Sequence, residues 1–506
     1  MIEEWIQKLR RAEAYGHPVE EIEVRQTHIS VVFLAGEFAY KLKKPVDFGF
    51  VDYSTLSRRR HFCEREVSLN RRLAPSVYLG VVPVCRDDSG SFTVDSKGAE
   101  VVEWAVKMRR LNPEDTLKKR LRREEVSRAQ FERIGELLGR FHADAASRPE
   151  IDRGASFEVV AGNCRDNFEQ AIWQVGDLVE EAVFRRAREL TEQRLEELRP
   201  LIEARAAGGV ARDTHGDLRL EHLYLGGEAI QVVDCVEFND DFRFADPVSD
   251  VAFLTMDLGI RGFAREARWV WDAYFGDGGA GDEARQLIEF YEAYRSLVRA
   301  KVRGLQWADE GVEAAVREDA GQKARAHWLY GLNRLEGPGR GPALILVGGL
   351  PGVGKSTFCR RLVKGEGVHR HLDSDVVRKE LAGLSPEASA RAAVDEGIYS
   401  GEWTEKTYRE LGKRAGELLR RGERVVVEAS FISDSRRRAL LAVGRRLGVP
   451  VQFVECVAPE QVVLTRLQAR AEDPSDAGVA VYRAMRERWE QPSSEVQRIH
   501  RVEETG

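Results

Sequence analysis

Residues 349–356, with the sequence GLPGVGKS, have the residue types and the spacing of a loop that binds phosphate groups. An apolar segment, PALILVGG, precedes this loop, and a helix-forming segment, TFCRRLVKG, follows it. Glycines let the backbone wrap around an anion with its N–H groups pointing inward, and the helix N-terminus adds a positive dipole. Lys355 would reach the outer phosphates of ATP, and the Ser356 hydroxyl would lie on Mg2+. We therefore predict an ATP and Mg2+ site formed by Gly349, Gly352, Gly354, Lys355, Ser356 and Thr357.

Two further charged residues follow a short expected strand in the segment HRHLDSDVVRKEL. In a doubly wound sheet, the carboxyl end of the strand beside such a loop faces the outermost phosphate. Asp375 would orient and deprotonate an acceptor hydroxyl there, and Arg378, one helical turn later, would clamp an anionic acceptor group. The alternative is a plain helix start, in which Asp373 or Ser374 caps the helix and Asp375 only favours its dipole.

Two arginines of the segment APEQVVLTRLQARAEDPSDAG would share one helical face, because Arg466 and Arg470 lie four residues apart. This segment resembles a lid, and the arginines would close over a transferring phosphoryl group. Arg466 is then a candidate catalytic residue, with Lys355 and Asp375, and Arg470 is a candidate acceptor-binding residue, with Arg378. The alternative is a pair of solvated helix charges.

Residues 342–500 resemble the P-loop kinases that phosphorylate small hydroxylated molecules or nucleic-acid ends, including gluconate-kinase-like, zeta-toxin-like and polynucleotide-5′-kinase-like enzymes. The resemblance implies an α/β P-loop NTPase domain with a doubly wound parallel sheet. Many P-loop proteins carry Asp at the end of the strand RVVVEASF, where this chain has Glu428. That departure leaves open how Mg2+ is supported.

A second group of candidate residues lies in THGDLRLEHLYL, residues 214–225, and in the following segment, which begins IQVVDCVEFND. A His-Gly-Asp loop, a hairpin and an apolar strand ending in Asp resemble the catalytic core of aminoglycoside-phosphotransferase-like kinases, which share the protein-kinase architecture. By that resemblance, Asp217 receives the acceptor hydroxyl proton and Asp234 holds Mg2+ against the phosphates. His215 would brace the loop, and Asp250 would fix it.

His222 departs from the pattern of this family, which places Asn five residues after the catalytic Asp as a Mg2+ ligand. Mg2+ prefers oxygen ligands. Either His222 does something other than hold the metal, or the site works with one firmly held ion, or its activity is reduced.

The same resemblance requires a lysine and a glutamate near the N-terminus. The segment EFAYKLKKPVDFGF offers Lys41 and Lys43 on one face of an alternating strand, and Phe-Ala-Tyr-Lys aligns Lys41 with the Val-Ala-Ile-Lys pattern of kinases. In the helix RRRHFCEREVSLNRRLAP, we prefer Glu66 to Glu64, since the following leucines give its turn an inward apolar face. Lys41 and Glu66 are therefore predicted to contact the nucleotide. Solvated surface charges are the alternative.

The elements that must position these residues divide the chain into three parts. We expect an α+β protein-kinase-like, two-lobed domain over residues 1–333, with lobes 1–104 and 105–333, then a Gly/Pro-rich linker over 334–342 and the P-loop kinase domain over 343–506. The six cysteines show no CxxC spacing, so neither a zinc site nor a disulfide framework is indicated. No apolar run approaches the roughly 20 residues of a bilayer span, and we expect a cytoplasmic protein without membrane contact.

Together, the two halves look like proteins commonly labelled bifunctional aminoglycoside-phosphotransferase/ATP-binding proteins. We expect a Mg2+- and ATP-dependent kinase with two modules, each transferring the γ-phosphoryl to a hydroxyl of a small molecule. One alternative is a single active P-loop kinase gated by a degenerate, ligand-binding first half, and another is a polynucleotide 5′-hydroxyl kinase. The net charge of −6 argues against an extended nucleic-acid groove, though not against a short local site. The sequence does not identify either acceptor.

Overall fold

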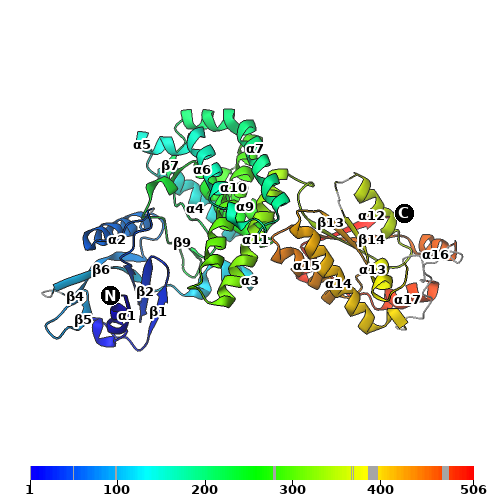
Figure 1. Ribbon diagram of the computed structural model, residues 1–506, viewed down its shortest axis with the longest axis horizontal. Helices are drawn as coiled ribbons and strands as arrows, with labels where there is room; N and C mark the ends of the chain where they lie inside the picture. The colour runs from blue at the N-terminus through cyan, green and yellow to red at the C-terminus, as the bar shows by residue number, and fades with distance from the viewer. Residues whose placement is uncertain are drawn as a thin grey trace. The chain divides into compact units, whose positions relative to one another are not determined.

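The computed structural model describes residues 2–49, 51–96, 100–276, 281–365, 367, 370–385, 397–469 and 478–505 (Figure 1). Contacts divide the chain into two compact units. The first unit comprises Met1–Val160, Arg199–Leu258 and Ala264–Ile288. The second unit comprises Ala161–Leu198, Gly259–Phe263 and Glu289–Gly506. Each unit contains one of the two groups of candidate residues.

A six-stranded antiparallel sheet forms the N-terminal lobe of the first unit, in the order β1-β2-β3-β6-β4-β5. Its strands are β1 (Ile22–Gln26), β2 (Ser30–Ala35), β3 (Phe38–Lys43), β4 (Tyr78–Arg86), β5 (Phe92–Val94) and β6 (Glu100–Arg109). Helix α1 (Ile2–Leu9) joins the core of one face, and helix α2 (Leu56–Asn70) packs on β4 and β6. Strand β6 continues to Arg109, across the lobe boundary expected at residue 104.

Alternation along β3 explains why its lysines share one face. Tyr40 and Leu42 lie in the core that includes α1, so the residues between and beside them point to the opposite face. Cys63 and Val67 of α2 belong to the core on that opposite face. The Thr55 side chain caps α2 by accepting a hydrogen bond from the N–H of Arg58 at 3.3 Å, which fixes where the helix begins.

Helices make up most of the remainder of the first unit. They are α3 (Leu117–Arg122), α4 (Arg128–Asp144), α5 (Pro149–Asp152), α8 (Pro247–Gly259) and α9 (Ala264–Phe275), with parts of α6 (Phe157–Glu169), α7 (Glu181–Ala207) and α10 (Asp282–Ala308). Two short antiparallel pairs, β7 (Arg212–Asp213) with β10 (Phe244–Ala245) and β8 (Leu223–Tyr224) with β9 (Gln231–Val232), flank the loop that carries His-Gly-Asp. This combination of an antiparallel sheet lobe and a helical lobe is the α+β kinase-like fold expected from the sequence.

A five-stranded parallel sheet lies at the centre of the second unit, in the order β12-β13-β11-β14-β15. Its strands are β11 (Leu344–Gly348), β12 (Arg370–Asp373), β13 (Val425–Glu428), β14 (Val451–Val457) and β15 (His500–Glu504). The helices that follow are α12 (Lys355–Gly365), α13 (Ser374–Leu381), α14 (Gly401–Arg420), α15 (Asp434–Arg446), α16 (Glu460–Ala469), α17 (Val479–Glu487) and α18 (Ser494–Gln497).

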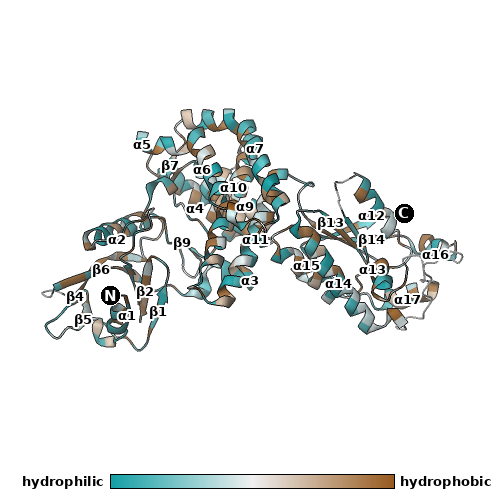
Figure 2. Ribbon diagram, in the orientation of Figure 1, coloured by the Kyte–Doolittle hydropathy of each residue, from teal (hydrophilic) through white to brown (hydrophobic). Residues whose placement is uncertain are grey.

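Helices cover both faces of this sheet. Leu344 and Leu346 share a core with residues of α14 and α15, whereas Ile345 and Val347, which alternate with them, share another core with residues of α12, α16 and α17. Because both faces are covered, the strands are apolar along their length, and Figure 2 shows β13 and β14 largely in brown. The domain is therefore the doubly wound α/β P-loop fold expected from the sequence.

The second unit also contains helical segments that the sequence assigned to the kinase-like half. Residues 161–198 and 289–336, including α11 (Ala314–Glu336), share one apolar core with α14 and α15, and Trp328 of α11 is fully buried in it. The contact-defined units thus differ from the domain boundaries expected at 333 and 343. Among the described residues, no helix combines the length and apolar character needed to cross a bilayer.

Candidate functional sites

An ion-pair network places the predicted lysine of β3 between two carboxylates in the first unit. The Lys41 ammonium lies 2.8 Å from Glu66 Oε1 and 3.0 Å from Asp234 Oδ1. Burial alone would lower the pKa of Lys41, but these carboxylates outweigh it and raise the pKa well above its usual value. The same lysine holds the pKa of Asp234 far below its usual range. The three predicted residues therefore converge, with Lys41 and Asp234 both charged.

Asp234 has a left-handed backbone conformation, with φ of 66°. A residue other than Gly rarely adopts such a conformation, and it persists only where the surroundings impose it. The Asp234 N–H donates to the Tyr78 hydroxyl at 3.2 Å, which is one such constraint. In this conformation, the Asp234 carboxylate lies 3.0 Å from the Lys41 ammonium.

A second lysine of the same face, Lys43, extends this network into the interior. Its ammonium lies 2.8 Å from Glu66 Oε2 and also forms an ion pair with Glu237, whose carboxylate accepts a hydrogen bond from the Tyr53 hydroxyl at 2.7 Å. Lys43, Glu66 and Tyr53 are at most 1% exposed. Glu66 thus bridges both lysines, so Lys43 anchors the glutamate while Lys41 faces the site.

Asp250 holds the backbone of the loop that carries Asp217. Asp250 Oδ2 and Oδ1 each accept a backbone hydrogen bond at 3.0 Å, from the N–H groups of His215 and Gly216. Burial raises the pKa of Asp250, but the hydrogen bond with His142 and these backbone bonds outweigh it and hold the pKa at about 2. Gly216 has φ of 82°, and a Cβ there would lie 2.9 Å from the Phe242 carbonyl oxygen. Asp250 therefore contacts the loop that the family resemblance expects it to fix.

His215 is a buried, neutral brace. Its Nε2 lies 3.1 Å from the Val233 carbonyl oxygen, and its Nδ1 accepts from the Asp217 N–H at 3.4 Å. Burial lowers the pKa of His215 to about 4. The ring joins the Asp217 loop to the strand that leads to Asp234.

Arg219, which the sequence reasoning missed, contacts the candidate catalytic carboxylate. Its Nη2 lies 2.8 Å from Asp217 Oδ2 and 2.9 Å from His222 Nε2, and Nη1 forms an ion pair with Glu221. Its side chain is 15% exposed. The signal that could have found it is its position two residues after Asp217, on the same loop.

The candidate metal site of the first unit contains a nitrogen donor as well as carboxylate oxygens. Beside the Asp234 carboxylate lies an imidazole, with His222 Nε2 3.6 Å from Asp234 Oδ2. Asp234 fits a divalent cation held jointly with nucleotide phosphates, but the adjacent nitrogen does not match the preference of Mg2+ for oxygen.

The loop predicted to bind phosphates has the required backbone shape in the second unit. Gly349, Gly352 and Gly354 have φ of 135°, 81° and 98°. A Cβ at Gly349 would lie 2.5 Å from the Cys456 carbonyl oxygen, so no other residue fits there without a shift. Helix α12 begins at Lys355, which aligns the backbone N–H groups of its first turn with the loop. Thr357, in that turn, is exposed.

Oxygen donors surround the position expected for Mg2+ in the second unit. The Ser356 hydroxyl donates to Glu428 Oε1 at 2.6 Å, and His371 Nε2 lies 3.0 Å from Glu428 Oε2. Burial raises the pKa of Glu428, but these two hydrogen bonds and Lys355 outweigh it and lower the pKa. Glu428 pairs in register with Asp373 of the next strand. Ser356, Glu428 and Asp373 therefore fit a Mg2+ ion, with Glu428 in the place where Asp is more usual.

Lys355 and Cys359 complete the surroundings of Glu428. The Lys355 ammonium donates to the Leu350 carbonyl oxygen at 3.0 Å, and burial lowers its pKa. Ligand atoms of Cys359, His371 and Glu428 lie within 4.8 Å of one another, but Cys359 and His371 each hydrogen-bond to Glu428. These hydrogen bonds explain why the three side chains lie close together, so no metal ion besides the predicted Mg2+ is needed there.

Asp375 and Arg378 lie on α13, but the two side chains have different partners. Asp375 accepts from the Tyr399 hydroxyl at 2.9 Å and lies 2.8 Å from the Lys379 ammonium. Arg378 is buried and donates to the Ile398 carbonyl oxygen at 2.9 Å. Asp373 caps the helix, as the alternative interpretation expected for that residue. Tyr399 is a contact of Asp375 that no sequence motif indicated.

Arg466 lies beside the phosphate-binding loop. Its Nη2 donates to the Thr505 carbonyl oxygen at 3.0 Å, and its Nη1 is 3.5 Å from the position that a Cβ at Gly354 would take. Nη1 is buried and without a hydrogen-bond partner within the described part of the chain. Arg470 lies outside the described residues.

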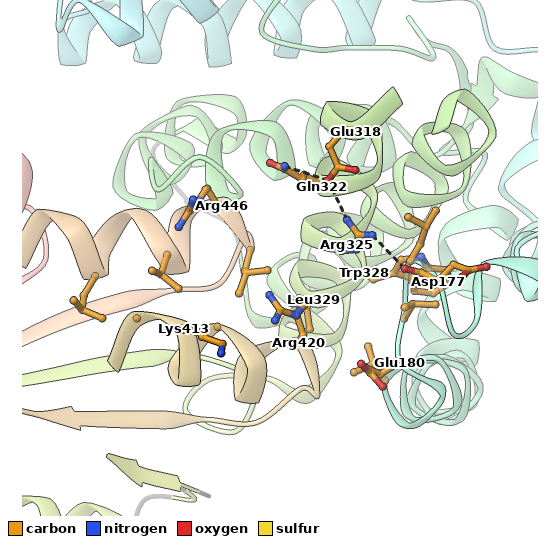
Figure 3. Close-up of a pocket in the computed structure, with 18 of the residues that line it drawn as sticks. Asp177, Glu180, Glu318, Gln322, Arg325, Trp328, Leu329, Lys413, Arg420 and Arg446 are labelled. Carbon is orange, nitrogen blue, oxygen red and sulfur yellow. Dashed lines mark hydrogen bonds and ion pairs between the residues drawn. The ribbon is translucent and has the colours of Figure 1, made fainter. Parts of the chain in front are cut away.

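A cavity of about 770 Å³ in the second unit is separate from these residues (Figure 3). Glu318 and Arg325 of α11 line one side of it, Lys413 and Arg420 of α14 line another, and none of the predicted site residues is among its lining residues. This cavity is therefore not the predicted phosphate site.

The fold and the two sites define a chain with two kinase-type domains. Residues 55–288 match the phosphotransferase enzyme family, and residues 344–492 match an AAA domain. The chain is 32% identical over 482 residues to Rv2004c of Mycobacterium tuberculosis (strain ATCC 25618 / H37Rv), an uncharacterized protein, and this match covers 93% of this chain and 91% of that protein. Mb2027c of Mycobacterium bovis, also uncharacterized, matches to the same extent. The chain belongs to the family of these proteins, in which it combines a phosphotransferase-family domain with a P-loop domain.

Solved structures resemble separate parts of the chain. A choline/ethanolamine kinase family protein from Mesorhizobium loti is 16% identical, with coverage of 66% of this chain and 98% of that one and a TM-score of 0.38. Aminoglycoside 2′-phosphotransferase-IIIa is 14% identical, with coverage of 62% and 94% and a TM-score of 0.40. A gluconokinase from Sinorhizobium meliloti is 21% identical, with coverage of 33% and 85% and a TM-score of 0.24.

Proposed function

We propose that each unit is an ATP-dependent phosphotransferase that passes the γ-phosphoryl group to a hydroxyl of a small molecule. The observation that carries the proposal is the placement of a lysine, a metal-type carboxylate and a potential base in the first unit, with a complete phosphate loop in the second. Two family matches to kinase-type domains support it. The products of the two units are separate in this proposal, since nothing in either site requires a shared acceptor.

In the first unit, Lys41 binds the nucleotide phosphates while Glu66 keeps its ammonium in place. Asp217 accepts the proton of the acceptor hydroxyl, and its loop stays in position because Asp250 holds two backbone N–H groups. Arg219 leaves Asp217 for the transferring phosphoryl group, which frees the carboxylate to act. Asp234 holds the divalent cation, which neutralises charge on the phosphates when bound.

In the second unit, the loop N–H groups and Lys355 bind the phosphates of ATP, and Lys355 exchanges the Leu350 carbonyl oxygen for a phosphate oxygen. Ser356 and Glu428 hold the Mg2+ that neutralises the phosphates. Asp375 orients and deprotonates the acceptor, and Arg466 stabilises charge on the transferring group. Arg378 shapes the acceptor side through its contact with the 397–404 segment. Arg470 is proposed to contact the acceptor from the lid.

The test is phosphate transfer from γ-labelled ATP into a metabolite extract. It compares the full-length chain with Asp217→Ala and Lys355→Ala, each beside a matched control. Asp241→Ala is the control for the first unit, since Asp241 is exposed near the same loop, and Lys364→Ala is the control for the second, since Lys364 is exposed on the same helix as Lys355. We expect each site variant to lose a different labelled product and each control to keep both. Retention of all products in both site variants would refute the proposal.

A second candidate is supported by the position of Arg219. Because the guanidinium contacts Asp217, it blocks the potential base unless it moves. If it does not move, the first unit is a degenerate kinase that binds a ligand and gates the second. In the same experiment, this candidate predicts that Lys355→Ala abolishes all transfer while Asp217→Ala loses no product.

A further inference from the structure

We propose that His222 supplies a nitrogen ligand to the divalent cation of the first unit, and that this site consequently binds first-row transition dications more tightly than Mg2+. The inference rests on the proposed function, because the cation is expected to arrive with ATP. It assigns a role to the residue at which this chain departs from the kinase pattern.

The hydrogen bonds of His222 determine which ring nitrogen carries the proton. Arg219 Nη2 lies 2.9 Å from His222 Nε2, and a guanidinium group can only donate, so Nε2 is the unprotonated nitrogen. His222 Nδ1 lies 2.8 Å from the Asp217 carbonyl oxygen, which can only accept, so Nδ1 carries the proton. These two bonds fix the tautomer and the ring plane. A metal-ligating histidine is commonly held in this way, with one nitrogen donating to a carbonyl and the other free to ligate.

The unprotonated nitrogen faces a carboxylate oxygen. His222 Nε2 lies 3.6 Å from Asp234 Oδ2, and the other oxygen of Asp234 is engaged by Lys41 at 3.0 Å. Neither facing atom carries a proton, so the two acceptors cannot hydrogen-bond to each other. Bonds of about 2.1 Å from one ion reach two atoms at this separation. The side chain of His222 is 8% exposed and that of Asp234 is 49% exposed, so the position between them is open on the Asp234 side.

The positively charged side chain of Arg219 contacts one acceptor atom on Asp217 and one on His222. The Arg219 guanidinium is 2.8 Å from Asp217 Oδ2 and 2.9 Å from His222 Nε2. It also pairs with Glu221, which gives it an alternative position when a cation takes its place at Nε2. Arg219 therefore places a positive charge at the nitrogen that the proposed cation would take.

The donor set decides which cation binds best. Mg2+ prefers oxygen ligands and gives up its water reluctantly. An imidazole nitrogen suits first-row transition ions, whose affinity for such sites rises from Mn2+ through Co2+. A site built from one carboxylate, one imidazole and the nucleotide phosphates should therefore select these ions over Mg2+, with Co2+ bound more tightly than Mn2+.

The experiment detects the nitrogen directly and needs no turnover. The full-length chain carries Lys355→Ala, so that the second unit does not hold the nucleotide, and is loaded with Mn2+ and the β,γ-methylene analogue of ATP. Pulsed electron paramagnetic resonance then reports whether a 14N nucleus is bonded to Mn2+. We expect the 14N signal in this protein and in its His61→Asn derivative, since His61 is exposed on α2. We expect its loss in His222→Asn, together with about a tenfold or greater loss of Mn2+ affinity, the change that loss of even an outer metal partner produces.

Two further measurements keep the result decisive if His222→Asn folds poorly. Incorporation of 15N-histidine into the unmutated site should replace the 14N signal with a 15N signal, and calorimetric titration of the nucleotide measures binding independently of the spectrum. Bound nucleotide and Mn2+ without a histidine nitrogen signal would overturn the inference and leave the proposed function intact. Absence of nucleotide binding would overturn the inference together with the proposed function of the first unit.

Discussion

Replacement of Lys43 by Met should destabilise the first unit strongly, whereas replacement of Lys41 should mainly abolish its activity. The two lysines share Glu66, with each ammonium 2.8 Å from one of its carboxylate oxygens. Lys43 is 1% exposed and also neutralises Glu237, which is 4% exposed. Without Lys43, the buried charge of Glu237 would keep only the Tyr53 hydroxyl as a hydrogen-bond donor and the weaker attraction of Lys41.

The expected size of the effect follows from this burial. Removal of one partner of a buried ion pair costs about 3–5 kcal/mol, because the other charge is left uncompensated. We expect about 3 kcal/mol for Lys43→Met, since Glu66 keeps Lys41 and Glu237 keeps Tyr53. Lys41→Met leaves Glu66 paired with Lys43 and leaves Asp234, whose side chain is 49% exposed, to water. Its cost should be about 1 kcal/mol or less, the range of partly solvated pairs.

Differential scanning calorimetry of the full-length chain is the assay, with Lys44→Met as the control. Lys44 follows Lys43 directly and forms no ion pair within the described residues. At about 2–4 °C per kcal/mol in domains of 150–250 residues, the transition of the first unit should fall by about 6–12 °C in Lys43→Met. The double variant Lys43→Met with Glu237→Leu should recover much of this loss, because apolar residues replace both charges. A transition in Lys43→Met equal to that of Lys44→Met, or lower stability in Lys41→Met, would refute the reasoning.

Three further predictions concern the loop that carries Asp217 and the expected Mg2+ position of the second unit. Gly216→Ala should lower the free energy of unfolding of the first unit by about 1–3 kcal/mol in urea denaturation, because the residue has φ of 82° and a Cβ would meet the Phe242 carbonyl oxygen; an unchanged midpoint would contradict the strain argument. Burial lowers the pKa of His215 to about 4, so on acidification the unfolded chain binds this proton before the folded chain does. The contribution of the neutral ring to the stability of the first unit is therefore complete above about pH 6.5. It is lost, by up to about 3 kcal/mol, as pH falls from there through 4. Thermal melts across this range should show a flatter profile in His215→Gln, and an identical slope would contradict the assignment. Glu428→Gln should weaken Mg2+-dependent nucleotide binding by the second unit about 10–100-fold in calorimetric titration, since Ser356 loses its charged partner; equal affinity would exclude Glu428 from the metal site.

The phosphate-binding loop could be predicted from sequence because its requirements are local. Glycines at 349, 352 and 354 permit the positive φ values observed, and the adjacent strand and helix follow in the expected order. Lys41 and Lys43 could likewise be placed on one face from alternation alone. Their separate surroundings could not be predicted, because Glu237 and Asp234 lie nearly two hundred residues further along the chain.

Side-chain partners that depend on tertiary packing also could not be predicted from the sequence. The role of Arg378 at the acceptor stays a prediction, but its contact with the Ile398 carbonyl oxygen could not be predicted, because no motif marks that segment. Arg219 lies within the HGDLRL segment, yet its contact with Asp217 depends on how the loop turns. The grouping of helices with the P-loop sheet depends on an apolar core assembled from distant segments, including Trp328 and Leu440.

Reactive groups of both units contact internal hydrogen-bonding or ion-pair partners. Asp217 is paired with Arg219, Lys355 with the Leu350 carbonyl oxygen, and Glu428 with Ser356. Binding of nucleotide and cation must therefore exchange one contact for another rather than desolvate a free charge. Such an exchange keeps each group oriented before the ligand arrives, and preorganised groups pay little reorganisation when charge develops. In the function proposed for the first unit, the same exchange moves a guanidinium away from a carboxylate and an imidazole, so movement of Arg219 would distinguish a catalytic site from a gating module.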